Sequence, residues 1–270
     1  MKNDNLQKYA LITGGTSGIG KELAKLFAQD GYNLVIVARG LEGLARIKME
    51  LVNGYGVEVI TLSKDLSLPG SAIELYNEIC ERNIFIDVLV NDAGQGQYGL
   101  FTKSDLDRVL EIIQLNIISL TTLTYLFLKD MVAHEKGKIL QLGSIASESP
   151  GPWQAVYHAT KAFVLSLSEG IRQEVKDTGV TVTVLEPGPT DTNFFKTADM
   201  LDSKVMDGKL SDPAAVAKDG FDGLFQGKDK VISGFKNKLD VVSGNILSDA
   251  SSAARMGKMQ EPRDQQRGKY

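Results

Sequence analysis

The chain has 270 residues, of which 43% are hydrophobic and 24% charged, and its formal net charge is -4. This composition is typical of a soluble protein with a sizeable core, and the mild acidity gives no reason to expect nucleic acid or a lipid surface as a partner. The single cysteine, Cys80, excludes an intramolecular disulfide and a cysteine metal site within this sequence, and we expect no metal.

The first predicted elements are a strand over residues 8–13 and a helix over residues 18–30, joined by a glycine-rich turn. The turn reads Thr13-Gly14-Gly15-Thr16-Ser17-Gly18-Ile19-Gly20. A strand that turns sharply into a helix points backbone N–H groups and the positive end of the helix dipole at one spot, where a pyrophosphate can bind. The turn therefore predicts a dinucleotide site, with a plain structural turn between core elements as the alternative.

Strands and helices alternate along the rest of the chain. Predicted strands cover residues 33–38, 57–62, 87–91, 138–143, 180–186 and 230–233, and predicted helices cover residues 41–52, 70–82, 104–134 and 154–176, with another helix beginning near Asp212. Continuous apolar runs such as residues 33–38 are typical of strands buried on both faces. The pattern predicts an α/β fold, a Rossmann-type doubly wound parallel sheet of about seven strands with helices on both faces.

Residues 1–270 contain no internal repeat and no linker, so we expect a single dinucleotide-binding catalytic domain. Residues 236–270 are polar with little periodicity and predict a loosely packed tail. Residues 1–8 are polar and lack an apolar segment of signal-peptide length, so we expect a cytoplasmic protein.

Residues 109–128 form an apolar stretch about as long as a bilayer-spanning helix. Glu111, Gln114 and Asn116 lie inside this stretch and would be costly in hydrocarbon. We therefore predict a core helix that is interrupted near Asn116, and no membrane span.

Ligands of open doubly wound sheets bind beyond the carboxyl ends of the strands. The groups that follow the predicted strands are the glycine turn, Arg39, Asp65, residues 91–94, Ser144 and residues 187–192. Arg39 stands where a carboxylate would select NAD(H) by bonding to the ribose 2′-hydroxyl, and its guanidinium can bind a 2′-phosphate instead. The sequence thus predicts NADP(H) as the preferred cofactor; the alternative is an Arg39 stacked on the adenine of either NADP(H) or NAD(H).

Tyr157 and Lys161 are four residues apart near the start of a predicted helix, so both lie on one face. Such a pair alone says little, but Ser144 follows the preceding strand and Asn116 interrupts the helix before it. A phenol with a reference pKa of about 10 is a poor acid or base at neutral pH. A nearby ammonium group favours the phenolate and would move this pKa toward a useful range.

In their order along the chain, these motifs resemble those of short-chain dehydrogenases/reductases of the compact, non-extended kind. The resemblance runs from about residue 8 to about residue 231 and covers residues 13–20, Asp65, Asn91-Asp92-Ala93-Gly94, Asn116, Ser144, Tyr157-His158-Ala159-Thr160-Lys161, Pro187-Gly188 and Thr192. The chain is similar to members described as ketoacyl or hydroxysteroid reductases. Several motifs in register make the resemblance specific.

The resemblance implies four catalytic residues. Tyr157 would donate a proton to a carbonyl oxygen as the nicotinamide delivers hydride, and Ser144 would hydrogen-bond that oxygen. Lys161 would lower the pKa of Tyr157 and bind the nicotinamide ribose, and Asn116 would hold a water molecule. The implied cofactor-binding residues are Gly14, Thr16, Ser17, Gly18, Ile19, Gly20, Arg39, Asp65, Asn91, Ala93, Gly94, Tyr157, Lys161, Pro187, Gly188, Thr190 and Thr192.

One residue departs from the family's pattern, because Asp92 stands where Asn-Asn-Ala-Gly usually has its second asparagine. Aspartate keeps an acceptor but loses the amide donor, which puts one bond of that turn in doubt. His134 and His158 are predicted to be surface or edge residues. Trp153 either walls the substrate pocket or packs at the base of the following helix.

Residues 193–209 mix polar residues with apolar ones, namely Phe194, Phe195, Met200, Leu201, Val205 and Met206. This pattern predicts a mobile flap whose apolar side closes over the substrate and excludes water, with an ordinary amphipathic connector as the alternative.

We therefore predict an NADP-dependent oxidoreductase that transfers hydride between NADPH and a carbonyl or secondary alcohol on a hydrophobic substrate, such as a ketoacyl, steroid-like or aryl ketone. Family members commonly form dimers or tetramers, and the apolar residues 109–128 permit a homodimer or homotetramer here. The alternative from another class is a non-catalytic NADP-binding redox sensor or scaffold, which could dispense with Tyr157 and Lys161.

Overall fold

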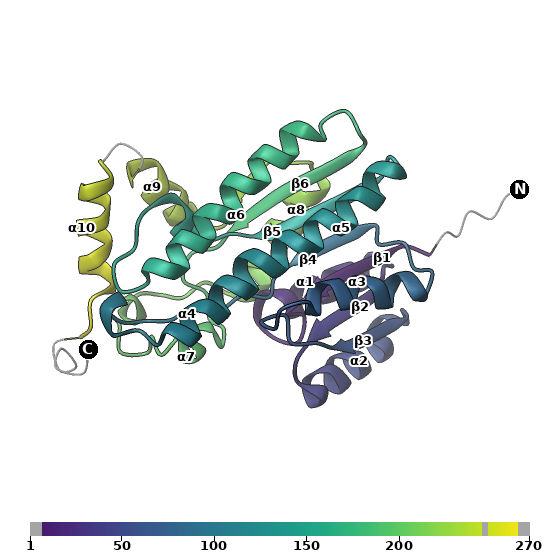
Figure 1. Ribbon diagram of the computed structural model, residues 1–270, viewed down its shortest axis with the longest axis horizontal. Helices are drawn as coiled ribbons and strands as arrows, with labels where there is room; N and C mark the ends of the chain where they lie inside the picture. The colour runs from purple at the N-terminus through teal and green to yellow at the C-terminus, as the bar shows by residue number, and fades with distance from the viewer. Residues whose placement is uncertain (1–6, 245–247, 264–270) are drawn as a thin grey trace, which may run out of the picture.

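The computed structural model describes residues 7–244 and 248–263 and contains a seven-stranded sheet (Figure 1). The strands are β1 (Tyr9–Thr13), β2 (Asn33–Ala38), β3 (Val59–Ser63), β4 (Val88–Asn91), β5 (Gly137–Leu142), β6 (Val180–Glu186) and β7 (Lys230–Ile232). Their order is β3-β2-β1-β4-β5-β6-β7, and neighbouring strands are parallel. The predicted doubly wound parallel sheet is confirmed.

Helices cover both faces of this sheet (Figure 1). They are α1 (Gly18–Gln29), α2 (Leu41–Tyr55), α3 (Ser71–Glu81), α4 (Leu106–Ile113), α5 (Leu120–Ala133), α6 (Ala155–Glu174), α7 (Phe194–Thr197), α8 (Pro213–Phe225), α9 (Phe235–Gly244) and α10 (Asp249–Gln260). Side chains of α1, α2 and α8 share one buried cluster with the sheet, and those of α3 and α5 share another. Because successive strand residues point to opposite faces, Ala10 and Ile12 join the first cluster while Tyr9 and Leu11 join the second.

The sheet reverses its winding between β1 and β4, which are neighbours in space although β2 and β3 separate them in sequence. In doubly wound folds, the crevice at the carboxyl ends of two such strands is the ligand site. The glycine turn follows β1 and residues 91–94 follow β4. The fold therefore brings these two segments to one rim of the sheet.

The long helix predicted over residues 104–134 is interrupted where the sequence indicated. α4 and α5 are joined by η2 (Gln114–Ser119), a π-helical segment that contains Asn116. A π-helical turn inserts an extra residue into a helix and frequently occurs at functional sites. The insertion sets the direction in which Asn116 leaves the helix.

Within the described residues, Leu106–Ala133 is the one helical stretch that could cross a membrane by length and composition, with a mean hydropathy of 1.5 over its apolar window. A core helix passes the same test. Leu123, Phe127 and Met131 of α5 pack into the cluster that α3 shares with the sheet. This packing is that of a helix covering the sheet.

The stretch predicted as a loosely packed tail contains most of α9 and all of α10. Both helices lie at one end of the molecule (Figure 1). The Tyr98 hydroxyl and the Ser203 hydroxyl donate hydrogen bonds to the carbonyl oxygen of Gln260, at the end of α10. α10 is therefore packed onto the rest of the chain, while residues 245–247 and 264–270 of the predicted tail lie outside the described residues. The single-domain organisation stays a prediction.

Candidate active site

The glycine turn brings its backbone close to neighbouring segments at the end of β1, because Gly14, Gly18 and Gly20 carry no side chains. Gly14 and Gly18 have φ angles of 73° and 55°, which glycine adopts at little cost. A Cβ atom on Gly14 would lie 3.0 Å from the Ala93 backbone nitrogen, and one on Gly20 would lie 2.8 Å from the Gly14 carbonyl oxygen. The turn therefore fits closely against the segment after β4, and a side chain at either position would force the backbone apart.

The first turn of α1 follows directly and carries no acidic side chain. Ser17 is its N-cap residue and makes no side-chain capping bond. Thr16 packs beside Gly43 of α2, and Ile19 packs against the cluster that α1 shares with the sheet. Side chains thus leave the start of the helix open, which suits an anion such as a pyrophosphate.

The loop after β6 meets this turn from the other half of the chain. A Cβ atom on Gly18 would lie 3.0 Å from the methyl carbon of Thr192. The Thr190 hydroxyl donates to the Gly188 carbonyl oxygen at 2.9 Å, which shapes the loop. The side chain of Asn237, from α9, fills the space beside Gly188. Gly18 and Thr192, two predicted cofactor residues that lie far apart along the chain, are therefore neighbours in space.

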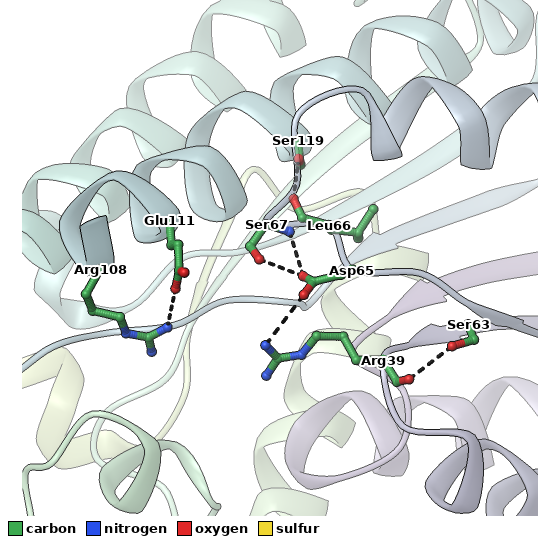
Figure 2. A network of polar contacts seen from close by, with 8 residues as sticks. All are labelled: Arg39, Ser63, Asp65, Leu66, Ser67, Arg108, Glu111 and Ser119. Carbon is green, nitrogen blue, oxygen red and sulfur yellow. Dashed lines mark hydrogen bonds and ion pairs between the residues drawn. The ribbon is translucent and has the colours of Figure 1, made fainter. Parts of the chain in front are cut away.

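Arg39 and Asp65 form an ion pair beyond the ends of β2 and β3 (Figure 2). Arg39 Nη1 lies 3.9 Å from Asp65 Oδ2, and the Arg39 side chain is 58% exposed. The Ser67 backbone N–H and hydroxyl donate to the Asp65 carboxylate at 3.0 and 2.6 Å. Burial acts to raise the pKa of Asp65, but the Ser67 bonds and the Arg39 charge hold it below its usual value. The guanidinium is thus directed by Asp65 and remains open to solvent.

Asn91 ties β4 to the elements around it. Its amide nitrogen donates to Gln141 Oε1 at 3.0 Å and to Thr124 Oγ1 at 3.1 Å, and the residue is buried. The Ala93 backbone N–H donates to Thr13 Oγ1 at 3.1 Å. The side chain of Asn91 therefore holds β4, β5 and α5 together, and its contact with a cofactor stays a prediction.

Lys161 lies at the centre of the site and is only 6% exposed. Its Nζ donates to the carbonyl oxygen of Leu142, at the end of β5, at 2.5 Å. Asn116 is 1% exposed, and its Nδ2 donates to the Gln95 carbonyl oxygen at 2.8 Å. A Cβ atom on Gly94 would lie 3.5 Å from Asn116 Oδ1 and 3.6 Å from Lys161 Nζ. Lys161, Asn116 and the backbone of Gly94 therefore meet at one point.

Ser144 lies directly after β5 and connects this strand end to the loop after β6. It is the N-cap of η3 (Ile145–Glu148), where its Oγ accepts a hydrogen bond from the Ala146 N–H at 3.1 Å. The same hydroxyl donates to the Pro187 carbonyl oxygen at 3.4 Å. Backbone groups on both sides therefore fix the position of the Ser144 hydroxyl.

Tyr157 adjoins both Ser144 and Lys161. Burial raises the pKa of Tyr157 to about 12, and hydrogen bonding with Ser144 acts in the opposite direction. Lys161 Nζ lies 5.8 Å from the centre of the Tyr157 ring and bonds to the Leu142 carbonyl oxygen. The structure therefore differs from the expected lowering of the Tyr157 pKa by Lys161, because burial is the largest influence on the phenol and the ammonium group donates to the Leu142 carbonyl oxygen.

Asp92 lies against the glycine turn, where its carboxylate can accept hydrogen bonds but cannot replace the amide donor of the family's usual asparagine. Its carboxylate fills the space beside Gly14 and Gly20 and accepts the Gly20 N–H. Burial raises the pKa of Asp92 to about 7, while the Lys161 charge and the Gly20 N–H act against this rise. Burial likewise lowers the pKa of Lys161 to about 8, opposed by Asp92. Asp92 thus couples the glycine turn to Lys161.

An apolar cluster, which we call the apolar wall, adjoins Tyr157. It consists of Tyr98, Trp153, Phe194, Phe195, Ala198, Met200, Val205, Met206 and Leu210. The Phe194 ring centre lies 5.0 Å from that of Tyr157, and the Trp153 ring stacks on Tyr98 at 6.0 Å. A Cβ atom on Gly96 would lie 2.7 Å from the Phe194 ring. Residues 193–209 therefore pack beside Tyr157 and Trp153 belongs to the wall, while motion of this segment stays a prediction.

His158 is a residue for which the sequence-based prediction was wrong. It is 3% exposed, whereas His134 is exposed as predicted. The His158 ring fills the space beside Gly151, where a side chain would overlap it. Burial lowers the pKa of His158, and the carbonyl oxygens of Ser149 and Ala146 act against this shift. No pattern in the sequence indicated this burial, because it depends on how the loop before α6 folds back over the ring.

Glu186 is a buried acidic residue that the sequence analysis did not single out. It is the last residue of β6 and directly precedes Pro187. Burial and the charge of Glu148 raise the pKa of Glu186 to about 8, and the Lys230 charge acts in the opposite direction. Lys230 pairs with Glu148 at 2.5 Å. An acidic residue at the end of the apolar run 180–186 was the signal that could have identified it.

This chain is similar in sequence to known dehydrogenases and reductases. The sequence model of a family described as "short chain dehydrogenase" matches residues 8–200. The dehydrogenase/reductase SDR family member 7B of Mus musculus is 30% identical over 233 residues, which cover 82% of this chain and 72% of that protein. The very-long-chain 3-oxoacyl-CoA reductase of Coprinopsis cinerea is 33% identical over 178 residues, which cover 64% of this chain and 52% of that protein. This chain thus matches about half of the second relative.

A solved structure shares the arrangement of most of the chain. It is a short-chain dehydrogenase from Sphingobium yanoikuyae in complex with NADPH, with a TM-score of 0.77 and 28% sequence identity. The match covers 88% of this chain and 92% of that chain. The similarity therefore extends beyond the residues that the family's sequence model matches.

Asp92→Asn tests the carboxylate beneath the glycine turn. Because the folded state raises the pKa of Asp92 to about 7, the folded protein keeps a proton that the unfolded chain has released above about pH 4. Stability therefore falls as the pH rises through this window. Asparagine keeps the acceptor and removes the charge, so it avoids this loss of stability. We therefore subtract the Tm of the wild type from that of the variant at each pH, and this difference should be about 2–6 °C larger at about pH 8 than at about pH 5.

Thermal unfolding of both proteins at the two pH values checks this expectation. Asp177→Asn, in an exposed turn, serves as the matched control and should show no such difference. A Tm difference for Asp92→Asn that is the same at both pH values would contradict the assigned pKa shift.

Proposed function

The chain belongs to the short-chain dehydrogenase family, and we propose that it is an NADP(H)-dependent oxidoreductase acting on a carbonyl or secondary alcohol of a hydrophobic substrate. The observation that carries this proposal is the meeting of Tyr157, Ser144 and Lys161 beside Gly94, on the rim where the glycine turn lies. A non-catalytic sensor would have no need of such a proton-donating group at the end of its cofactor site.

Tyr157 is the proton donor in this proposal. With a pKa of about 12, its phenol stays protonated at neutral pH and can donate to the oxygen of a carbonyl group as negative charge develops there. The Ser144 hydroxyl, which is held by backbone groups, can donate to the same oxygen and stabilise that charge. When bound, the reduced nicotinamide would supply the hydride. In the oxidising direction Tyr157 takes the proton back from the alcohol.

Lys161 and Asn116 support Tyr157 from inside the protein. With a pKa of about 8, Lys161 can lose and regain a proton near neutral pH. Asn116 donates to Thr160 Oγ1 at 3.0 Å and accepts the Gln95 N–H at 3.0 Å, so it braces α6 against the loop after β4. We assign Asn116 this bracing role, beside the water-holding role that the family resemblance implies.

The rim at the end of β2 favours NADP(H) over NAD(H). Arg39 occupies the position of a ribose-binding carboxylate, and its exposed guanidinium is directed by Asp65. A guanidinium can bind a ribose 2′-phosphate through two parallel hydrogen bonds. The NADPH found in the related Sphingobium enzyme supports the same choice. The backbone around Gly14 and Gly18 would hold the pyrophosphate.

The apolar wall supports a hydrophobic substrate, such as a ketoacyl, steroid-like or aryl ketone. Its aromatic and methionine side chains adjoin Tyr157 through Phe194, so an apolar group attached to the carbonyl carbon would pack against them. The name of the fungal relative, a very-long-chain 3-oxoacyl-CoA reductase, supports the ketoacyl class in particular.

A second copy of the chain is the partner that we propose. Apolar side chains on α4, η2 and α5 are exposed to solvent in the single chain, namely Leu106, Leu110, Ile118 and Tyr125. Burying them against the same surface of another copy would form a self-complementary interface, as in a homodimer or homotetramer.

Tyr157→Phe tests the proposed chemistry. Removing the phenol hydroxyl deletes the proton donor and leaves the ring packing, so kcat for a ketone should fall by roughly 100- to 10,000-fold while NADPH binding changes little. Turnover is read as the loss of nicotinamide absorbance with a panel of hydrophobic ketones, and binding is read by calorimetry. Tyr55→Phe, at an exposed position on α2, is the control. Undiminished turnover in Tyr157→Phe would refute the assignment.

Arg39→Asp tests the cofactor preference. Aspartate should repel a 2′-phosphate and bond to a 2′-hydroxyl, so the ratio of kcat/KM with NADPH to that with NADH should fall by about 10- to 100-fold. Arg46→Asp, at an exposed position of α2, makes the same change of charge away from the rim. If the ratio stays constant in Arg39→Asp, or falls equally in the control, Arg39 does not select the cofactor.

A further inference from the structure

His158 directly follows Tyr157 and forms hydrogen bonds at both ring nitrogens. Nδ1 lies 2.7 Å from the Ser149 carbonyl oxygen, and Nε2 lies 2.9 Å from the amide nitrogen of Gln260. A carbonyl oxygen can only accept, so Nδ1 carries the hydrogen of the neutral ring and Nε2 accepts from the Gln260 amide. The donors and acceptors of this pair are thus fixed by their surroundings.

Gln260 is the last residue of α10 and joins further segments through its backbone. The residue is 5% exposed, and its carbonyl oxygen accepts from the Tyr98 hydroxyl at 2.5 Å and from the Ser203 hydroxyl at 3.1 Å. Tyr98 belongs to the loop after β4 and Ser203 to the segment 193–209. One residue near the C-terminus therefore contacts the loop after β4, the segment after β6 and the helix that carries Tyr157.

The loop over residues 149–154, which precedes α6, is held by the same contacts. Its Gly151 makes room for the His158 ring, and its Pro152 lies 3.4 Å from where Gly257 of α10 would carry a Cβ atom. Trp153 has a φ angle of 71°, an unusual value for a residue with a side chain. Its carbonyl oxygen accepts the Gly99 N–H at 2.9 Å. The surroundings thus hold this loop in a conformation that it would not favour alone.

The residues beyond Gln260 extend the contact along the segment 193–209. The Lys204 N–H donates to the Glu261 carbonyl oxygen at 3.1 Å, and Ser203 forms a β-bridge with Pro262. The Arg263 guanidinium pairs with Asp207 at 2.7 Å. Residues 261–263 are therefore bound to this part of the chain by their backbone as well as by side chains.

We propose that the Gln260–His158 hydrogen bond is a latch through which α10 fixes the segments that form the apolar wall beside Tyr157. In this role Gln260 and His158 are positioning residues for the reaction at Tyr157, and α10 is part of the substrate pocket. The effect on catalysis rests on the proposed function, whereas the latch itself does not. Trp153, Tyr98 and the segment that carries Phe194 all lie on the latched segments, so the latch sets the shape of the pocket for the substrate.

Gln260→Leu opens the latch selectively. Leucine removes the amide donor to His158 but keeps the backbone carbonyl that Tyr98 and Ser203 use, so the fold and NADPH binding should be retained. Trp153 is the only tryptophan of the chain, and its emission should shift to longer wavelength and become more accessible to acrylamide. The kcat/KM for a hydrophobic ketone should fall about tenfold, consistent with one lost hydrogen bond at a buried site. Gln173→Leu, on the exposed side of α6, is the matched control.

Gln260→Glu shows whether the effects of Gln260→Leu come from the lost hydrogen bond to His158 or from a general loss of packing. A carboxylate can only accept, so it restores the bond when the His158 ring is protonated and both ring nitrogens donate. The pKa of His158, followed by its proton NMR signal, should rise above that of the wild type, with the exposed His134 as internal reference. Below that pKa, kcat/KM should recover relative to Gln260→Leu.

The outcomes distinguish the latch from the proposed function. Unchanged Trp153 emission and an unchanged His158 titration in both variants would refute the latch. Altered spectra with the wild-type kcat and KM in Gln260→Leu would refute the positioning role. Failure of the wild-type protein to reduce any ketone would count against the proposed function, and the fluorescence and NMR results would still decide whether the latch exists.

Discussion

The site depends on the compensation of the buried Lys161 ammonium charge by neighbouring groups. A charge that is removed from water is costly unless partners compensate it, and here they come from the ends of neighbouring strands. The Leu142 carbonyl oxygen at the end of β5 accepts a hydrogen bond, and the Asp92 carboxylate after β4 supplies the opposite charge. Asp92 also accepts the Gly20 N–H in the first turn of α1. Lys161 thereby couples the glycine turn to the helix that carries Tyr157.

The same burial sets the proton chemistry of the site. It brings the pKa of Asp92 to about 7 and that of Lys161 to about 8, so both groups exchange protons near neutral pH. It raises the pKa of Tyr157 to about 12 and keeps the phenol in the form that donates. The apolar wall packs beside Tyr157, and α10 holds that wall in place through the proposed latch. Tyr157, the glycine turn and the apolar wall thus share one set of packed contacts.

The fold could be predicted because buried parallel strands leave an apolar run in the sequence, as at residues 33–38, which are the bounds of β2. The interruption at Asn116 could be predicted because a polar amide inside an apolar helix needs partners. The hydrogen bond between Gln260 and His158 could not be predicted, because the two residues are 102 positions apart and no local pattern links them. α10 was missed for a related reason: its buried residues include Ser252 and Gln260, so it packs through polar contacts and lacks an apolar stripe. The sequence could place the site motifs at the carboxyl ends of the strands. It could not predict the pKa shifts of Asp92, Tyr157 and Lys161, because these depend on burial that only the tertiary structure shows.

The crystal structure of the protein with NADPH bound tests the central claim most directly, because it does not require the substrate to be known. The account predicts the pyrophosphate against residues 14–20, the 2′-phosphate within hydrogen-bonding distance of Arg39, and the nicotinamide beside Tyr157 and Lys161. It also predicts that the bond between Gln260 and His158 is retained. A nicotinamide ring bound away from Tyr157, or a 2′-phosphate that Arg39 does not contact, would contradict it.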